Sequence, residues 1–334
     1  MKYTIATLAS HSCLQILKGA KDEGFKTLAF ALSDKFSFYQ RFSFIDEIIS
    51  LESFKEIYEW GNKLKNKKII IIPHGSFVAY LGEDYDRKLQ FSHYGSKKVL
   101  EWEGDRIKQM MWLKEAGLLL PKIYSDKAEI DQLVIVKLFG ARGGSGYFLA
   151  KDRDDFKKKI KKFKGKKYIV QQYMVGTPVY LQYFYSRLKK QIELMGVDRR
   201  YETNVDGLSR IPGNLGLGFD MEPSFTVIGN FPIVIRESLL PEVYAMGEKI
   251  IKISKKLIPP KGLYGPFCLE TIITKNQKFY CMEISCRIVA GTNLYLKGSP
   301  YTDLSYNEPM STGRRIALEI KEAIEQKKLK EILD

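Results

Sequence analysis

Residues 263–287 read Leu-Tyr-Gly-Pro-Phe-Cys-Leu-Glu-Thr-Ile-Ile-Thr-Lys-Asn-Gln-Lys-Phe-Tyr-Cys-Met-Glu-Ile-Ser-Cys-Arg. Two apolar, β-branched and aromatic runs flank a short polar segment, and this pattern predicts a β-hairpin. A two-residue loop at residues 276–277 fits the polar segment. Counting back along the antiparallel ladder from that loop sets Glu270 directly opposite Glu283, with both carboxylates on one face.

The opposed glutamates have two interpretations. Directly opposed residues have Cβ atoms about 5 Å apart, and two ionised carboxylates at that distance repel by about 3 kcal/mol at an effective dielectric of about 20. Either both lie on a solvated sheet face, or a divalent cation lies between them. Apolar residues on both faces of the hairpin favour the metal interpretation, because unpaired charge is costly in a covered sheet. Carboxylate oxygens completed by phosphate and water suit Mg²⁺ or Mn²⁺.

Length and composition limit the class of protein. The chain has 334 residues, enough for two or three domains and a substantial core. It contains no run of about 18 uncharged apolar residues and begins like a strand rather than a signal peptide, so we expect no membrane segment and a cytoplasmic location. Four cysteines without C-x-x-C spacing and three histidines argue against a structural zinc site and predict reduced, packed thiols.

The formal net charge of +15 is compatible with nucleic-acid binding, anionic small substrates or a lysine-coated surface. The densest basic run, residues 151–167, has Phe156, Ile160 and Phe163 at helical spacing. This spacing predicts an amphipathic helix with a solvated basic face. No aromatic residues alternate with the lysines to stack on bases, so we expect no nucleic-acid partner.

The first hundred residues alternate strands and helices. Strands are predicted at residues 3–8, 25–32 and 68–73, with a helix at residues 12–23 that Gly24 ends. This alternation predicts a small parallel sheet flanked by helices.

Two polar clusters follow strands of this sheet, Ala-Ser-His-Ser at residues 9–12 and His-Gly-Ser at residues 74–76. Ligands of open α/β sheets collect at the carboxyl ends of strands, so the two clusters are candidates for one binding site. For Ser10 or Ser12 alone, a helix N-cap is the preferred interpretation. His93 has no comparable context and is expected to be a surface or turn residue.

A glycine-rich segment, residues 138–147, lies between two predicted strands, and Lys137 ends the first of them. Its glycines can turn several backbone N–H groups toward phosphate oxygens. The segment is neither a P-loop nor a dinucleotide fingerprint, because both of those open a helix. A flexible hairpin would also need glycines, but a lysine inside an apolar strand calls for an anionic partner.

The rest of the chain supplies further elements. The stretch 198–232 is polar and glycine-rich, which predicts a long irregular loop with a functional role. Strands are predicted at residues 168–173, 179–184 and 191–197, and helices at residues 101–116, 241–257 and 313 to about 333. The strand at residues 168–173 can present backbone groups to adenine.

Lys137, the glycine loop, the strand at residues 171–173 and the two glutamates together resemble the ATP-grasp fold over residues 101–334. The resemblance implies an α/β and α+β protein in which a small parallel-sheet domain, residues 1–100, precedes the ATP-grasp fold. That fold would divide into a glycine-loop domain, residues 101–172, and a metal- and substrate-binding domain, residues 173–334. Over its whole length the chain resembles the archaeal formate-dependent 5-formaminoimidazole-4-carboxamide ribonucleotide synthetases, most closely in the motifs at residues 9–12, 73–80, 140–148, 204–207 and 265–270.

This resemblance implies the ligands and the residues that bind them. Glu270 and Glu283 would hold Mg²⁺ or Mn²⁺. Many ATP-grasp enzymes have Asn two residues after the second glutamate, where this chain has Ser285, which puts a second ion in doubt. The aminoimidazole carboxamide ribonucleotide (AICAR) would contact His11, Ser76 and Asn230. ATP would contact Lys137, Gly140, Arg142, Gly143, Gly144, Ser145, Gly146, Gln171, Gln172, Tyr173 and Glu202.

The implied reaction is an ATP-dependent carbon–nitrogen ligation in purine synthesis. Formate would attack the γ-phosphorus while Lys137 and the metal offset charge, Arg287 would steady the formyl phosphate, and the 5-amino group of AICAR would take the formyl carbon. The resemblance also implies that the protein self-associates. Two rival hypotheses remain: an ATP-grasp ligase with a different carboxylate or amine acceptor, and a basic RNA-binding protein on an inactive ATP-grasp fold.

Overall fold

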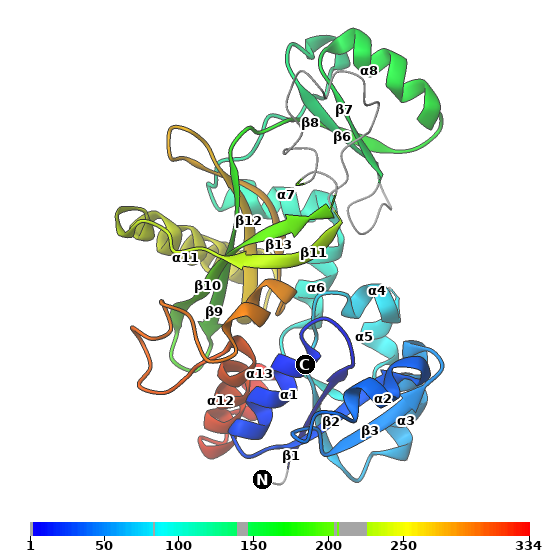
Figure 1. Ribbon diagram of the computed structural model, residues 1–334, viewed down its shortest axis with the longest axis vertical. Coiled ribbons are helices and arrows are strands. Elements are labelled where there is room, and N and C mark those ends of the chain that lie inside the picture. Colours follow the sequence, from blue (N-terminus) through cyan, green and yellow to red (C-terminus); the bar gives the residue numbers. More distant parts are fainter. Residues whose placement is uncertain (1–2, 83, 139–145, 204–205, 207–225) are drawn as a thin grey trace.

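A computed structural model describes residues 3–82, 84–138, 146–203, 206 and 226–334. Three sheets follow one another along the long axis of the molecule (Figure 1). The first sheet lies at one end, the smallest sheet at the other, and the sheet that carries the paired glutamates lies between them.

The first sheet confirms the predicted parallel arrangement, with strand order β3-β2-β1-β4-β5 and every pair parallel. Its central strands are almost fully buried, which is typical of a parallel sheet covered by helices. The strands are β1 (Tyr3–Leu8), β2 (Lys26–Leu32), β3 (Glu47–Leu51), β4 (Lys68–Ile71) and β5 (Ser92–His93), and the helices are α1 (Cys13–Asp22), η1 (Ser33–Lys35), α2 (Phe36–Tyr39), η2 (Phe54–Glu56), α3 (Ile57–Lys63), α4 (Phe77–Leu81) and α5 (Tyr85–Lys88).

The smallest sheet is antiparallel, with strand order β7-β6-β8. It has its own hydrophobic core, built around Val134, Val136, Phe148, Phe156 and Val170 and separate from the main core. Its elements are η3 (Lys127–Glu129), β6 (Val134–Leu138), β7 (Tyr147–Ala150), α8 (Arg153–Ile160), η4 (Lys161–Phe163) and β8 (Tyr168–Gln172).

The central sheet is antiparallel, with strand order β11-β10-β9-β12-β13. Two helices pack on it and on each other, and the Trp112 indole N–H of α7 donates to the Ile250 carbonyl of α11 at 3.2 Å. The elements are α6 (Lys97–Gly104), α7 (Arg106–Glu115), β9 (Thr177–Ser186), β10 (Gln191–Glu202), β11 (Val227–Pro232), η5 (Glu237–Leu239), α11 (Leu240–Leu257), β12 (Gly265–Ile273), β13 (Phe279–Ser285) and η6 (Ala290–Tyr295).

The C-terminal helix α12 (Thr312–Glu325) returns to the first sheet and packs against α1. The two helices touch at glycines: a Cβ added at Gly19 would lie 2.2 Å from the Arg314 backbone nitrogen, and one at Gly313 would lie 2.3 Å from the Gln15 carbonyl. The first and central sheets also share one continuous hydrophobic core. The tertiary structure therefore joins these two parts of the chain, although they are far apart in sequence.

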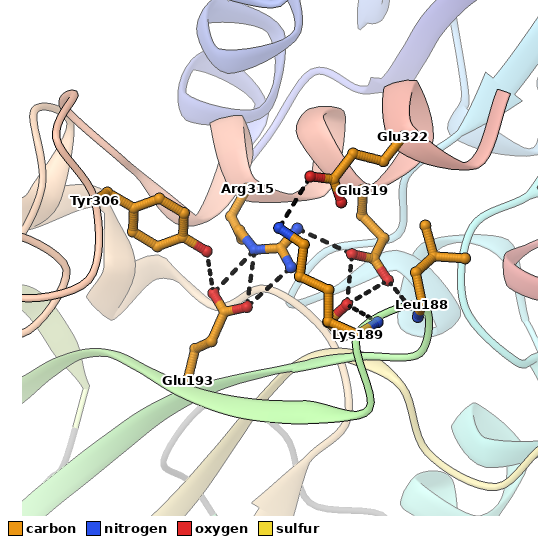
Figure 2. Close-up of polar contacts among 8 residues, drawn as sticks. Leu188, Lys189, Glu193, Tyr306, Arg315, Glu319 and Glu322 are labelled. Carbon is orange, nitrogen blue, oxygen red and sulfur yellow. Dashed lines mark hydrogen bonds and ion pairs between the residues drawn. The ribbon is translucent and has the colours of Figure 1, made fainter. Parts of the chain in front are cut away.

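A buried ionic cluster ties α12 to the central sheet (Figure 2). The Arg315 side chain is fully buried, and its guanidinium donates to Glu193 on β10 at 2.9 Å and to Glu319 at 3.0 Å. The hydroxyls of Tyr306 and Ser186 donate to Glu193 and Glu319, respectively. Every charge in the cluster is thus hydrogen-bonded, as burial of ions requires.

We expect Arg315→Met to lower the free energy of unfolding by about 3 to 5 kcal/mol, because it leaves two buried carboxylates without their cation. Chemical denaturation at neutral pH would measure the loss. Lys63→Met is the control, since Lys63 is half-exposed and pairs with exposed Glu59 at 3.7 Å, so its loss should cost less than about 1 kcal/mol. Equal effects of the two substitutions would contradict this role for the cluster.

Several predicted boundaries are wrong. The helix predicted at residues 101–116 is two helices, because Asp105 ends α6 and caps α7 by accepting from the amides of Ile107 and Lys108 at 2.9 and 3.1 Å. The closing helix ends at Glu325, and after Lys327, which has a φ of 60°, the short helix α13 (Leu329–Ile332) follows. The basic segment 151–167 is helical only over α8 and η4.

Two further predictions are wrong in ways that matter for the site. The polar stretch 198–232 is not wholly irregular, since it contains the end of β10 and the whole of β11. His93 is not a surface residue: it is completely buried on β5, and its Nδ1 is 3.1 Å from the Gly95 carbonyl oxygen. The domain boundaries remain predictions, and the boundary at residue 100 falls inside α6.

Among the helices of the described residues, none combines the length and the apolar character that crossing a membrane requires.

Candidate active site

The hairpin of β12 and β13 confirms the predicted pairing of Glu270 with Glu283. The predicted two-residue loop is wrong, because the Thr274 amide donates to the Lys278 carbonyl at 3.1 Å and three residues, 275–277, form the loop. That loop shifts the register by one residue. A β-bulge next to Glu270 absorbs the difference and restores the pairing of the two carboxylates.

The paired glutamates belong to a row of side chains that crosses the central sheet. Glu283 opposes Glu270, Glu270 opposes Tyr180 on β9, and Tyr180 opposes Asp198 on β10. Residues directly opposed in a sheet project from the same face. Arg200, two residues after Asp198, lies on that face too, and its guanidinium contacts Glu270 at 2.6 Å and stacks 4.0 Å from the centre of the Tyr180 ring.

Four residues of this face, Tyr180, Arg200, Glu270 and Glu283, line one side of a cavity of about 660 Å³. Small-sheet residues line the opposite side, so the cavity lies between the small and central sheets. The predicted site residues that it brings together are Lys137, Gly146, Tyr173, Glu202, Glu270 and Glu283, and Arg106 and Arg200 join them.

The two glutamates are partly neutralised by nearby cations. Burial, and secondly the Glu270 charge, raise the pKa of Glu283, while Lys137, Arg106 and Arg200 act against that rise. Burial lowers the pKa of Lys137, and the Glu283 charge opposes this. A carboxylate pair held this close fits a divalent cation, and hard oxygen donors suit Mg²⁺ or Mn²⁺. The described residues include no group of three or more His, Cys, Asp or Glu side chains around a metal position, so phosphates and water would have to complete the shell.

The glycine loop is only partly within the described residues. Gly140, Arg142, Gly143, Gly144 and Ser145 lie outside them, and their predicted contacts with ATP stay predictions. Gly146 has a φ of 77°, and its carbonyl accepts from the Leu138 amide at 2.8 Å where the strands β6 and β7 meet.

The three residues predicted to face adenine lie in different places. Tyr173 lines the large cavity. Gln171 is buried and lines a smaller adjoining cavity of about 130 Å³ with Lys137 and Glu283. In the described part of the chain, its side-chain oxygen has no hydrogen-bond partner. Gln172 lines neither cavity and instead bonds to Gln132 at 3.2 Å. Burial raises the pKa of the Glu202 carboxyl, which lines the large cavity.

His11 and Ser76 meet as predicted at the edge of the first sheet, where Ser76 Oγ lies 2.9 Å from His11 Nε2. Ser10 bonds to the other ring nitrogen at 2.8 Å, so Ser10 is not an N-cap. Ser12 occupies the N-cap position of α1, but its hydroxyl makes no capping bond, which corrects the side-chain capping interpretation. Burial, and secondly the Arg287 charge, lower the pKa of His11, so the ring is neutral at pH 7.

Asn230, the third residue predicted to bind the ribonucleotide, bonds to a buried carboxylate. Its amide group donates to Asp198 at 2.7 Å, and Gln182 donates to the other carboxylate oxygen at 2.6 Å. An ionised carboxylate only accepts, so the Asn230 amide nitrogen faces Asp198 and its oxygen faces away. Burial raises the pKa of Asp198 to about 6, against the effect of these two bonds and of Arg200.

The short helix η6 joins the His11 region to the Asn230 region. Its Asn293 donates to the His11 carbonyl at 3.1 Å. Its Gly291 packs so tightly on Asp198 that an added Cβ would lie 2.4 Å from a carboxylate oxygen. Sequence reasoning missed Asp198 and η6 as site elements. It also missed Glu103, which pairs with Arg287 at 2.7 Å and so orients the predicted catalytic arginine.

The chain matches two family models, described as "Domain of unknown function (DUF1297)" over residues 151–334 and "Protein of unknown function (DUF1246)" over residues 5–124. The 5-formaminoimidazole-4-carboxamide-1-(beta)-D-ribofuranosyl 5'-monophosphate synthetase of Pyrococcus horikoshii is 49% identical over 98% of this chain and 99% of its own. The solved structure of an IMP biosynthesis protein PurP from Thermococcus kodakaraensis aligns with a TM-score of 0.80 and 32% identity, over 99% of this chain and 100% of that one. The N5-carboxyaminoimidazole synthetase from Staphylococcus aureus, solved with ADP, shares the fold with a TM-score of 0.68 and 16% identity, over 96% of this chain and 78% of that one.

The fold and the site together define an ATP-dependent ligase of the ATP-grasp class. Within that class, the chain belongs to the family of 5-formaminoimidazole-4-carboxamide ribonucleotide synthetases, which its sequence resembles over nearly its whole length.

We expect Asp198→Asn to change how stability depends on pH. Folding raises the pKa of Asp198 from the ordinary carboxyl value of 3.8 to about 6, so the folded protein binds this proton more tightly than the unfolded chain does. The resulting contribution to stability is fully present below about pH 4 and is lost as pH rises through about 6. A rise of this size corresponds to about 3 kcal/mol. Relative to wild type, the variant should therefore gain stability between pH 4 and pH 7.5, as measured by urea unfolding.

Asp154→Asn is the matched control, because it removes one carboxylate from an 84% exposed side chain and corrects for the change in net charge. If the stability difference between wild type and Asp198→Asn stays constant over this pH range, the buried carboxylate is not strained by desolvation.

Proposed function

We propose that this protein uses ATP and formate to formylate the 5-amino group of AICAR, giving the 5-formamido ribonucleotide, ADP and phosphate in IMP synthesis. The names of its relatives and the ATP-grasp fold support this reaction. The observation that carries the proposal is the polar row of the central sheet. It runs from a carboxylate pair suited to a metal–triphosphate to Asn230, which is held by Asp198 and connected through η6 to His11.

In this proposal ATP binds in the cavity between the small and central sheets. Lys137 contacts a phosphate, because it is a half-buried cation that lines the cavity beside Glu270 and Glu283. Tyr173 and Gln171 are on the adenine side. The unpaired oxygen of Gln171 favours a ligand that donates a hydrogen bond, which an adenine amino group can do.

Glu270 and Glu283 hold Mg²⁺ or Mn²⁺, which supplies charge neutralisation for the triphosphate and for the transferring phosphoryl group. The fit rests on two opposed carboxylates with hard oxygen donors. Ser285 is buried on β13 beside them and is a weaker ligand than the Asn of many ATP-grasp enzymes, so we propose that the protein side chains hold one ion, whose shell phosphate and water complete.

The ribonucleotide binds where His11, Ser76 and Asn230 converge on η6. His11 is neutral, and its two ring nitrogens bond to the hydroxyls of Ser10 and Ser76, so it orients these hydroxyls toward the ligand without adding charge. The Asn230 oxygen faces away from Asp198, so it accepts from a donor such as an exocyclic amino group of AICAR.

The chemistry proceeds in two balanced steps. A formate oxygen attacks the γ-phosphorus, the new P–O bond forms, and the bond to the β,γ-bridging oxygen breaks with its electron pair going to ADP. The 5-amino nitrogen then attacks the formyl carbon, the C–O bond breaks, and phosphate leaves with the electron pair and takes up the amine proton. Arg287, held by Glu103, steadies the formyl phosphate in this scheme. Closure of the cavity protects that intermediate from water.

We further propose that the protein is cytoplasmic, since the four cysteines are buried free thiols. Its partners are then ATP, formate, AICAR and further copies of the same chain, without a nucleic acid. The basic residues of α8 are surface charge in this view.

The purified protein with Mg²⁺ should release ADP only when ATP, formate and AICAR are all present, and formylated product should match ADP mole for mole. Glu270→Ala and Glu283→Ala should each lower the rate at least about 100-fold, because each removes half of the carboxylate pair. Glu59→Ala, an exposed glutamate of α3, is the control and should keep wild-type activity.

ADP release with another amine or another carboxylate, and none with AICAR and formate, would assign the ligase to a different acceptor. RNA binding that is steeply salt-dependent and unaffected by Glu283→Ala, together with no ADP release, would reject the enzyme altogether.

A further inference from the structure

One arginine lies between the nucleotide half and the ribonucleotide half of the proposed site. Arg200 directly opposes Asn230 across β10 and β11, and its guanidinium contacts Glu270 on β12 at 2.6 Å. It therefore touches the predicted metal ligand and projects from the sheet next to the predicted ribonucleotide contact. Among the described residues, no other cation both opposes Asn230 in the sheet and pairs with Glu270.

The intermediate of the proposed reaction has to lie between these same two groups. Its phosphoryl end derives from ATP, which the glutamate pair would hold through a divalent cation, and its formyl carbon has to face the amine of the ribonucleotide near Asn230. We infer that Arg200 is a catalytic residue that binds the transferring phosphoryl group and then the phosphate end of formyl phosphate. This inference rests on the proposed function and names a residue that sequence reasoning had not assigned to the reaction.

The surroundings of Arg200 hold its guanidinium in one orientation. The group stacks on the Tyr180 ring at 4.0 Å, and Glu270 accepts one of its N–H groups. A guanidinium carries five N–H donors in a planar fork, so donors remain for two phosphoryl oxygens. Because the fork is already oriented, little ordering is lost when the charge of the transition state develops.

The other two candidate cations, Arg287 and Lys137, have different neighbours from Arg200. Arg287 pairs with Glu103 at 2.7 Å, and its charge acts on the His11 and His74 rings of the first sheet. Lys137 is a point charge on the small sheet, on the other side of the cavity. Of these three, Arg200 is the one whose ion pair in the described residues is with a member of the glutamate pair.

Arg200 takes no part in bond making and keeps its protons throughout. In the first step it donates hydrogen bonds to non-bridging oxygens of the γ-phosphoryl group while the P–O bond to formate forms and the P–O bond to ADP breaks. In the second step it stabilises the phosphate that leaves with the C–O electron pair, and the amine proton goes to that phosphate. The guanidinium lowers the barrier of each step because negative charge builds on the oxygens that it contacts.

The test compares Arg200→Met, Arg200→Lys and Arg199→Met. Arg199 is the matched control, because it is next in the same strand, projects from the opposite face, and pairs at 3.7 Å with Asp206. Arg200→Met should lower kcat by 100- to 1000-fold, and Arg200→Lys, which keeps charge but not the fork, should lose less. Arg199→Met should stay within about threefold of wild type. Circular dichroism verifies that each variant is folded.

A binding measurement gives a readout independent of turnover. With Mg²⁺, calorimetric titration of β,γ-methylene-ATP and of ADP should show that Arg200→Met weakens the triphosphate analogue at least 10-fold more than ADP, because only the former presents a γ-phosphoryl group. Equal weakening of both nucleotides, or none, would overturn the inference, since a merely structural arginine would affect both alike. A folded Arg200→Met enzyme with kcat within threefold of wild type would overturn it as well.

The two hypotheses fail in different ways. If the wild type makes no ADP with formate and AICAR, the proposed function fails, but a selective loss of triphosphate binding in Arg200→Met would still support a phosphoryl contact. If the wild type is active and the variant binds both nucleotides like wild type, the role of Arg200 fails while the function stands.

Discussion

Two glutamates held opposite each other in a covered hairpin are the constraint on which the site depends. Glu270 and Glu283 repel each other at this separation, so the surrounding structure has to supply positive charge. Arg200, Lys137 and Arg106 come from three different elements to do this, β10, β6 and α7. The same concentration of charge that would be unfavourable in an ordinary sheet is suited to a metal ion and a triphosphate.

The polar face continues from this pair across the central sheet. Tyr180 supports the Arg200 guanidinium, and Asp198 orients Asn230. Close packing holds the row against η6, which approaches Asp198 only because residue 291 has no side chain. His11 is attached to η6 through Asn293, so one short helix connects His11 to Asp198 and thereby the two halves of the proposed ribonucleotide site.

The ionic cluster around Arg315 is a different use of buried charge. Its carboxylates, arginine and hydroxyls bond to one another (Figure 2). It joins α12 to β10, the strand that also carries Asp198 and Arg200. One end of β10 thus carries Glu193, which is paired within the fold. The other end carries Arg200, whose guanidinium still has N–H groups to donate.

The amino-acid sequence by itself determined the hairpin, the parallel first sheet, Lys137 within its strand and the pairing of Glu270 with Glu283, because hydrophobic periodicity and local turn residues act over short distances. Even there the loop was wrong by one residue, and only the bulge beside Glu270 kept the pairing. Residues 198–202 are Asp-Arg-Arg-Tyr-Glu, a polar run without the apolar alternation of a strand, so Arg200 and Asp198 were not assigned to a sheet face. Tertiary structure alone decided that Arg200 meets Glu270, that η6 joins His11 to Asp198, and that His93 is buried, since each is a contact between segments distant in the chain and such contacts leave no local pattern.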